Sequence, residues 1–356
     1  MNYYNKKCLG CGNYFSNDIN NPTYVKNADS TTKYCKRCFR LINYNELDNS
    51  KIDEKQIIQT LENIDYKNNL IVMILDIFDI KNSIVEQIKD KENILVLVNK
   101  LSCLPKTFNR YTTLLKIKNI LNEEKINFID IILYDSVNSM NIRKIDDVLF
   151  KYFKNKKTIY IVGKTNVGKS SLINALLKYN KVNKKLSTSP FPNTTVNLSK
   201  IDLNKYTLID TPGYKNMNSV INYIDQTSIK QICDFKKIIN KNFLIKDNNQ
   251  VFFLEKLFYI SVINQNAGSI GFYCSSNIKI HRTKQDKIKQ ILQSKEMKLI
   301  EFKNDVWKEN KYILDENKKY NIFVNGICLI SIKKISKIII GVNSKIEIFI
   351  TENALI

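Results

Sequence analysis

The stretch "TIYIVGKTNVGKSSLINALLKY", residues 158–179, decides the fold of this chain. It begins with the apolar run "TIYIV", which is typical of a buried strand, and ends with "SLINALLKY", whose apolar residues have helical spacing. The loop between them, "GKTNVGKS", fits the pattern G-x-x-x-x-G-K-[ST], in which backbone N–H groups and a helix N-terminus surround phosphate oxygens. Because a chance match between a strand and a helix is uncommon, the stretch predicts a nucleoside triphosphate site.

Each polar residue of this loop has a role that phosphate chemistry explains. Lys169 would reach the β- and γ-phosphates, and the hydroxyl of Ser170 would bind Mg²⁺. The predicted nucleotide contacts from this part of the chain are Gly163, Lys164, Thr165, Asn166, Val167, Gly168, Lys169, Ser170 and Ser171.

A second motif, "DTPG" at residues 210–213, follows the strand-like run "YTLI". Asp210 would hold Mg²⁺ through water, and the N–H of Gly213 would face the γ-phosphate. The segment "SPFPNTT" before it carries Thr194 and Thr195, of which we favour Thr195 as the switch threonine that closes on Mg²⁺. A proline-broken loop without a role is the alternative. The predicted catalytic set is Lys169, Thr195, Asp210 and Gly213.

A third motif, "NKLS" at residues 99–102, follows the apolar run "ILVLV". Asn-Lys-any-Asp in this position recognises guanine, but Ser102 stands where the aspartate is expected. A serine offers one neutral hydrogen bond where a carboxylate accepts two charge-assisted ones, which costs ~2–3 kcal/mol of base discrimination. Ser136 and its neighbour Val137, after the run "FIDIIL", fall where the loop that supports the base is expected. A chance Asn-Lys pair is the alternative for Asn99 and Lys100.

The order of these motifs indicates a circular permutation. The chain runs base box, phosphate loop, switch threonine and DTPG, which is the usual GTP-binding order with its back half moved to the front. A parallel sheet needs all of its strands but not a particular chain start. In this position, before a complete set of phosphate motifs, Asn99 and Lys100 are convincing as the base box.

Apolar runs predict the elements around these motifs. Four runs, separated by helix-compatible stretches, predict an α/β fold with a parallel sheet covered on both faces: residues 70–75, 94–98, 128–133 and 158–162. Residues 54–64 have the spacing of an amphipathic helix. "NLSKIDL" and "YTLID" predict a hairpin around Asn204 and Lys205.

Two cysteine pairs near the N-terminus predict a metal site. "CLGC" and "CKRC" contribute Cys8, Cys11, Cys35 and Cys38. Four thiolates in two C-x-x-C turns suit a closed, tetrahedral structural zinc site, although residues 12–34 make the spacing slightly long. A redox pair is the alternative. The neighbouring Arg37, Phe39 and Arg40 suit phosphate and base contacts, and the cysteines 103, 233, 274 and 328 suit small buried apolar positions.

Composition bounds the partners. A chain of 356 residues can hold two or three domains, and its net charge of +22 favours a polyanion such as nucleic acid. The alternative is the lysine bias of an AT-rich genome, but acidic codons are also AT-rich, so the bias does not fully explain the excess. Because no apolar run is long enough for a membrane span or a signal peptide, we expect a cytoplasmic protein with no membrane partner.

The pattern of apolar runs and polar stretches changes after about residue 217. A lysine-rich, helix-compatible stretch, 284–298, lies between strand-like runs such as "VFFLEKLFYISVI" and "YNIFV", which predicts an α+β domain. The predicted domains are therefore a zinc finger at 1–48, a circularly permuted G domain at 49–216 and a third domain at 217–356.

These motifs together resemble the YqeH family of circularly permuted GTPases. "CLGC", "CKRCFRLINYNE", "DIFDIKNS", "NKLSCLPK", "GKTNVGKSSLINAL", "SPFPNTT", "DTPG" and "HRTK" occur in the family's order over nearly the whole chain. The resemblance implies a treble-clef zinc finger, a C-terminal domain that binds RNA, and a potassium ion at Asn166. It also implies an apolar residue in place of a catalytic glutamine after the DxxG glycine, where this chain has Tyr214. The chain departs from the family at Ser102, where the family has Asp, and at Val137, where it has Ala.

The expected function follows from the motifs and the resemblance together. We expect a slow GTPase, stimulated by a partner or by potassium, that uses GTP, Mg²⁺ and Zn²⁺ and assists assembly of the small ribosomal subunit. Its expected partners are ribosomal RNA and small-subunit precursors, and we expect a monomer. The alternative is a non-catalytic nucleotide-binding RNA scaffold with a degenerate guanine site. A translational GTPase on mature ribosomes is disfavoured.

Overall fold

A computed structural model describes most of the chain. The described residues are 3–9, 13–19, 21, 23–43, 58–59, 61–105, 108–154, 158–183, 186, 198–214, 220, 223–225, 228–229, 232, 238–246, 249–263, 266–294, 306–324, 326–344 and 346–352, with side chains left out at 40–43. The chain forms two compact units. The first comprises residues 1–101 and 118–216, and the second comprises residues 102–117 and 217–356.

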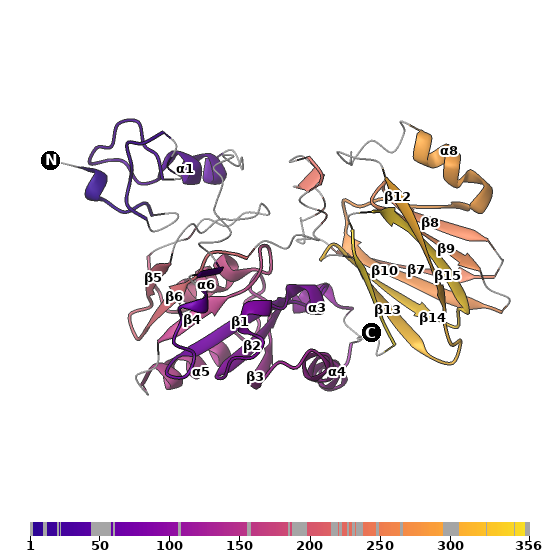
Figure 1. Ribbon diagram of the computed structural model, residues 1–356, viewed down its shortest axis with the longest axis horizontal. Coiled ribbons are helices and arrows are strands. Elements are labelled where there is room, and N and C mark those ends of the chain that lie inside the picture. Colours follow the sequence, from indigo (N-terminus) through magenta and orange to yellow (C-terminus); the bar gives the residue numbers. More distant parts are fainter. Residues whose placement is uncertain are drawn as a thin grey trace. The chain divides into compact units, whose positions relative to one another are not determined.

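The first unit is built on a six-stranded sheet with the order β3-β2-β1-β4-β6-β5 (Figure 1). The first five strands in this order, β3, β2, β1, β4 and β6, are parallel to their neighbours. The last strand, β5, forms an antiparallel hairpin with β6. The predictions of the four parallel strands and of the hairpin are confirmed. The strands are β1 (Leu70–Asp76), β2 (Ile94–Asn99), β3 (Phe128–Leu133), β4 (Ile159–Val162), β5 (Ser199–Asp202) and β6 (Thr207–Asp210).

The central strands are continuously apolar because both of their faces are covered. All seven residues of β1 and all six of β2 are buried. Alternate residues, such as Leu70 and Val72, share a core with Leu149 and Leu172, which lie on helices α5 and α6. The first unit holds helices α3 (Ile80–Ser83), α5 (Ile142–Lys154) and α6 (Lys169–Tyr179) and the 3-10 turn η2 (Glu86–Ile88). Helix α4 (Arg110–Glu123) and the 3-10 turn η3 (Leu101–Cys103) each contain residues of both units. Most of the predicted helix 54–64 lies outside the described residues.

The N-terminal segment has little regular structure. It consists of the 3-10 turn η1 (Tyr3–Asn5), helix α1 (Lys36–Asn43) and connecting loops. Its small core joins Phe15 and Val25 to the buried cysteines Cys8, Cys35 and Cys38. So few apolar side chains are a weak basis for independent folding.

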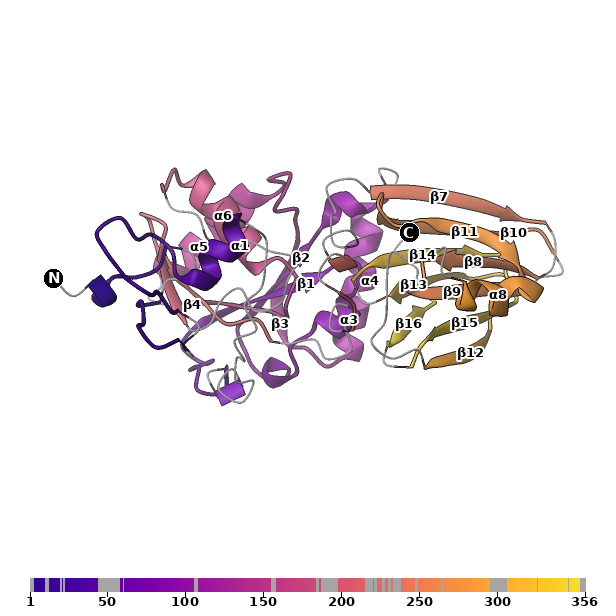
Figure 2. The same cartoon turned by 90° about the horizontal axis from the view of Figure 1, so that it is seen from above.

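The second unit contains two five-stranded sheets, with the orders β16-β13-β14-β10-β7 and β11-β8-β9-β15-β12 (Figure 2). The sheets face each other, because Phe252 of β8 contacts Phe243 of β7 and Phe272 of β10 at ring distances of 4.9 and 5.5 Å. The strands are β7 (Ile238–Ile245), β8 (Gln250–Leu254), β9 (Phe258–Ile263), β10 (Gly268–Ser275), β11 (Ile280–Lys284), β12 (Trp307–Ile313), β13 (Lys319–Val324), β14 (Cys328–Lys333), β15 (Lys337–Asn343) and β16 (Ile348–Thr351).

This unit has less helix than the predicted α+β domain. Within the predicted helical stretch 284–298, the described residues 284–294 form the 3-10 turn η5 (Gln285–Lys287) and α8 (Ile288–Gln293), whose Ile288 and Ile291 pack on the cluster that contains Phe253. The run "VFFLEKLFYISVI" holds two strands instead of one, since β8 and β9 pair around Glu255, which has a φ of +44°. None of the helices in the described ranges has the length and apolar character needed to cross a membrane.

Candidate nucleotide site and zinc knuckle

The phosphate loop joins β4 to α6, as the sequence predicts. Its conformation depends on residues that tolerate left-handed backbone: Gly168 has a φ of +100° and Asn166 a φ of +66°. A Cβ on Gly168 would lie 2.1 Å from Nδ2 of Asn99, and a Cβ on Gly163 would lie 3.0 Å from the carbonyl oxygen of Ile74. Close packing therefore favours glycine at both positions, and the left-handed backbone favours it at 168 as well.

Lys169 is the first residue of α6, and its ammonium group lies inside the loop. Nζ donates to the carbonyl oxygens of Gly163 at 2.8 Å and Lys164 at 3.3 Å. Burial lowers the pKa of Lys169 to about 8, while the nearby Asp210 acts in the opposite direction. An anionic phosphate would compensate this buried charge, so the arrangement suits a ligand with several negative charges.

The DTPG loop contacts the phosphate loop. The N–H of Thr165 donates to the carbonyl of Tyr214 at 2.8 Å, and Oγ1 of Thr211 donates to the carbonyl of Ile161 at 2.9 Å. A Cβ on Gly213 would lie 2.9 Å from Nζ of Lys169, so a larger residue here would displace the ammonium group from its present position. The carboxylate of Asp210, buried at the end of β6, lies in the same region, which brings a potential magnesium ligand beside the lysine.

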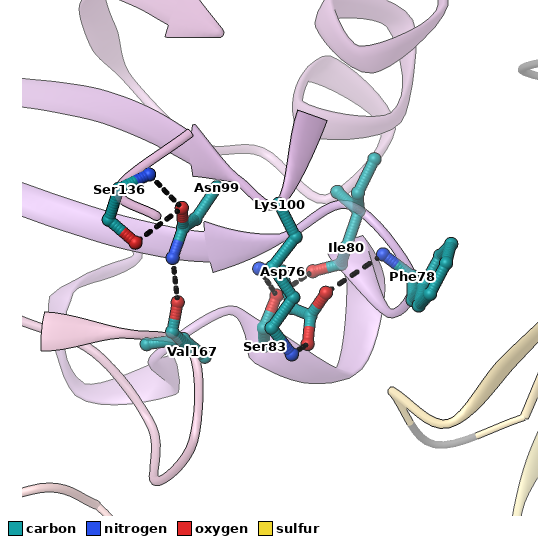
Figure 3. Close-up of polar contacts among 8 residues, drawn as sticks. All are labelled: Asp76, Phe78, Ile80, Ser83, Asn99, Lys100, Ser136 and Val167. Carbon is teal, nitrogen blue, oxygen red and sulfur yellow. Dashed lines mark hydrogen bonds and ion pairs between the residues drawn. The ribbon is translucent and has the colours of Figure 1, made fainter. Parts of the chain in front are cut away.

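The predicted base box meets the phosphate loop in space (Figure 3). Nδ2 of Asn99 donates to the carbonyl of Val167 at 2.9 Å. Oδ1 of Asn99 accepts from the N–H and from the hydroxyl of Ser136, both at 3.3 Å. One buried amide therefore ties the end of β2 to the phosphate loop and to the loop after β3, which lie far apart in the sequence.

Lys100 has a partner that sequence reasoning missed. It leaves β2 with a φ of +67°, and its Nζ forms an ion pair with Oδ2 of Asp76, the last residue of β1. The available signal was an aspartate at the end of an apolar run, at the edge where parallel strands place functional groups. Asp79, three residues later, is buried, and burial together with the neighbouring Asp76 raises its pKa to about 7.

Other predicted site residues have simpler environments. Ser102 is exposed in η3, and Val137 is 75% exposed. Ser170 and Ser171 lie in the first turn of α6. Thr194 and Thr195 lie outside the described residues. The assignment of a potassium ion to Asn166 stays a prediction.

Three of the four predicted zinc ligands lie together. The sulfur atoms of Cys8, Cys35 and Cys38 lie within 4.8 Å of one another and are buried, whereas Cys11 falls outside the described residues. The N–H of Cys35 points to the sulfur of Cys8 at 3.2 Å, and that of Cys38 points to the sulfur of Cys35 at 3.5 Å. Such N–H groups stabilise thiolates, so the donor set fits a metal better than a single redox pair does.

The structure confirms some of the other predictions for the cysteine-rich N-terminal segment, residues 3–43, which we call the knuckle, and contradicts one of them. Phe39 is 47% exposed, as a base contact requires, but Arg37 is only 3% exposed and packs inside the knuckle. The expectation that Arg37 meets phosphate is therefore wrong for this structure. The side chain of Arg40 is outside the described part. Cys103, Cys274 and Cys328 are buried as predicted, and Cys233 is outside the described ranges.

Comparison with known proteins, like the geometry of the phosphate loop, indicates a nucleotide-binding protein. Residues 158–265 match the family model described as "50S ribosome-binding GTPase". The "uncharacterized protein YqeH" of Bacillus subtilis (strain 168) is 29% identical over 287 residues, which cover 78% of this chain and 77% of that protein. The "probable GTP-binding protein EngB" of Mycoplasma capricolum subsp. capricolum is 32% identical over 161 residues, which cover 45% of this chain and 78% of that protein.

Among solved structures, one titled as the GDP-bound structure of TM YlqF aligns with 41% of this chain, and the alignment covers 53% of the chain in that structure. The sequence identity is 18% and the TM-score is 0.26, which is too low a likeness to carry an argument.

Proposed function

We propose that this chain is a member of the YqeH family of circularly permuted GTPases, to which it is similar over 78% of its length, and that it assists assembly of the small ribosomal subunit through contacts with ribosomal RNA. The observation that carries the proposal is the link made by Asn99. Its amide joins the predicted base box to Val167 of the phosphate loop and to Ser136, so parts that are permuted in sequence form one nucleotide site. In this proposal, binding and hydrolysis of GTP there switch the RNA-bound state of a cytoplasmic protein.

The residues of the site have distinct proposed roles. Lys169 offsets charge on the β- and γ-phosphates, and the N–H groups of the loop 163–170 bind phosphate oxygens. Ser170, Asp210 and Thr195 would hold Mg²⁺, which supplies charge neutralisation when bound. Tyr214 follows the DTPG glycine, and its phenol cannot orient water as a glutamine amide does. We therefore propose slow hydrolysis that a partner or potassium stimulates.

Surface chemistry supports RNA as the partner. In the N-terminal knuckle, Nζ of Lys7 lies 5.0 Å from the ring of Tyr14, which is 58% exposed, and Nζ of Lys36 lies 5.7 Å from the ring of Tyr24. Aromatic rings beside ammonium groups can stack on bases and contact phosphates together. We propose that zinc holds this surface in shape through the cysteines 8, 11, 35 and 38.

Hydrolysis is tested by measuring phosphate release from GTP, with and without potassium. Lys169→Ala should abolish release and weaken GTP binding, because its buried ammonium group bonds to two carbonyl oxygens of the phosphate loop and would lie beside the phosphates. Lys178→Ala is a matched control, since Lys178 is exposed on the same helix. Wild-type protein that binds RNA and GTP but releases no phosphate would favour the scaffold alternative.

The choice of ribosomal subunit needs its own experiment, because the description of the matching family model names the large (50S) subunit and not the small one. The protein should co-sediment with precursors of the small subunit, in the presence of a non-hydrolysable GTP analogue, more than with mature small subunits. Preferential binding to large-subunit precursors would contradict the proposed target and leave the GTPase activity untouched.

A further inference from the structure

The predicted base box has no carboxylate of its own, because Ser102 stands at its fourth position. The carboxylate that meets the box comes from the neighbouring strand. Asp76 ends β1 and is the register partner of Asn99 at the end of β2. The ammonium group of the next residue, Lys100, forms an ion pair with Oδ2 of Asp76 (Figure 3).

Hydrogen bonds within the turn after β1 hold Asp76 in place. Its Oδ1 accepts from the N–H of Phe78 at 2.9 Å, and its own N–H donates to Oγ of Ser83 at 3.1 Å. The hydroxyl of Ser83 in turn donates to the carbonyl of Ile80 at 2.9 Å. These bonds close the turn 76–83, so the protein fixes the direction of the carboxylate without help from a ligand.

The ion pair determines where the side chain of Lys100 lies. An unrestrained lysine side chain samples many rotamers, and the corresponding entropy is lost when the side chain is ordered. The side chains of Lys100 and Asp76 are only 15% and 7% exposed, so solvent screens their attraction less than it screens a surface pair. Because this entropy is lost during folding instead of during binding, the methylene chain of Lys100 is already ordered when a nucleotide arrives.

We propose that Asp76 is a positioning residue for recognition of the guanine base. It holds Lys100 so that the methylene chain lies against the base plane, and it thereby contributes affinity for the base that Ser102 does not supply. Asp76 does not itself contact the nucleotide. The proposal rests on the proposed function, in which the base lies at Asn99 and Lys100.

A purely structural role for Asp76 in its turn is the competing explanation, and three variants separate the two. Asp76→Asn keeps an oxygen that can accept from Phe78 but removes the charge that attracts Lys100. Lys100→Met keeps an unbranched chain but removes the ammonium group. Ser83→Ala disturbs the same turn and leaves both charges in place. Asp147→Asn is the matched control, because Oδ2 of Asp147 lies 3.9 Å from Nε of Arg143 and its side chain is 67% exposed.

The experiment compares a ligand that has a base with one that has none. Affinities of the full-length protein for GTP and for inorganic tripolyphosphate are measured with Mg²⁺ by competition against a fluorescent GTP analogue. Asp76→Asn and Lys100→Met should each weaken GTP by about tenfold and change tripolyphosphate less than about twofold. The double variant should bind GTP no more weakly than Lys100→Met, because the two residues act as one pair. Ser83→Ala and Asp147→Asn should keep the wild-type ratio of the two affinities.

Two results would overturn the proposal. If Asp76→Asn weakens tripolyphosphate as much as GTP, Asp76 acts through the fold and not through the base. If Asp76→Asn binds GTP like the wild type while Lys100→Met binds it weakly, Lys100 needs no positioning partner. A different failure, in which Lys100→Met also binds GTP like the wild type, would show that the base does not lie at this box, and the proposed site would fail together with the inference. Melting temperatures identify a variant that is merely unfolded.

Discussion

Base selectivity is decided by single residues, and Ser102 is the one that departs from the guanine box. The serine is exposed and carries no charge. Replacing it with aspartate would provide an acceptor for two charge-assisted bonds from guanine, each worth ~1.5–3 kcal/mol. We therefore expect Ser102→Asp to tighten GTP binding by about tenfold or more and to leave tripolyphosphate unchanged.

Competition by GTP, ITP, XTP and ATP against a labelled nucleotide measures this effect. Wild type should distinguish GTP from ITP and XTP less than Ser102→Asp does, because no carboxylate is present to attract the guanine amine or repel xanthine. A wild type that already rejects ITP, together with an aspartate variant that gains nothing, would mean that another residue supplies the carboxylate.

The buried carboxyl of Asp79 predicts a pH effect on stability. Its pKa is raised from 3.8 to about 7, first by burial and then by Asp76. Between these two values the folded state binds more protons than the unfolded state, so this group makes the free energy of unfolding fall as the pH rises, at up to about 1.4 kcal/mol per pH unit. Asp79→Asn should therefore raise the melting temperature at pH 8 but not at pH 4. Equal shifts at both pH values would show that the carboxyl stays ionised throughout.

For single residues, the sequence predicts which residues belong to a motif better than it predicts their hydrogen-bond and ion-pair partners. Lys169 and Asn99 could be assigned because their chemistry is local: one follows a glycine loop, and the other ends a buried strand. The pairing of Lys100 with Asp76 depends on the register of β1 and β2, which no local pattern specifies. Arg37 was assigned to the surface by residue type, but the small core of the knuckle buries it.

Among the elements, the zinc knuckle gives the clearest prediction. Because its core contains few apolar side chains besides the cysteines, the metal should supply much of its folding energy. Cys35→Ser should release zinc and unfold the segment that contains Phe15 and Val25, while the sheet of the first unit, which has its own core, still binds GTP. Metal content and tryptic cleavage measure this outcome.

Cys274→Ser is the matched control for this variant. It also changes a buried cysteine, but one that lies in β10 opposite Cys328 and does not belong to the cluster of Cys8, Cys35 and Cys38. Its zinc content should equal that of the wild type. Purified wild type without zinc, together with a Cys35→Ser variant that behaves like it, would instead support the redox alternative.

The strands show which patterns carry structural information and which do not. Continuous apolar runs predicted the central strands β1 and β2 because both of their faces are covered, whereas the edge strand β3 keeps exposed residues in its first half. The second unit was harder, since its sandwich pairs strands such as β10 and β14 that are distant in sequence. The stretch 284–298 had helical composition, and among its described residues 284–294 the short helix α8 packs on the cluster of Val251 and Phe253.

At the scale of the whole molecule, the chain divides into a unit with the parallel sheet and a unit with the sandwich. The change of sequence character near residue 217 coincides with the start of the second unit's longer segment. Residues 102–117, however, group with this second unit, and no composition change marks them. The prediction of three separate domains stays a prediction, because the three-domain division needs evidence on which parts fold alone.

The net charge of +22 should appear as a strong dependence of RNA binding on salt. On the second unit, β11 presents exposed His281, Arg282 and Lys284, and the guanidinium of Arg282 lies 6.0 Å from the ring of Phe252. Each phosphate contact releases counterions, so the affinity for small-subunit ribosomal RNA should fall steeply between 50 and 200 mM salt. Replacing Arg282 and Lys284 with Gln should reduce the slope of log affinity against log salt by about 1 for each lost contact.

The matched control for β11 removes two exposed lysines of the other unit, Lys118→Gln with Lys200→Gln. Both double variants lower the net charge by the same amount, so a general charge effect would change the two slopes equally. If RNA binds through the strand β11, only the Arg282 and Lys284 variant loses slope, and the affinities of both variants for GTP stay at the wild-type value. Equal losses, or a flat salt response of the wild type, would mean that the lysine excess reflects composition and not a binding surface.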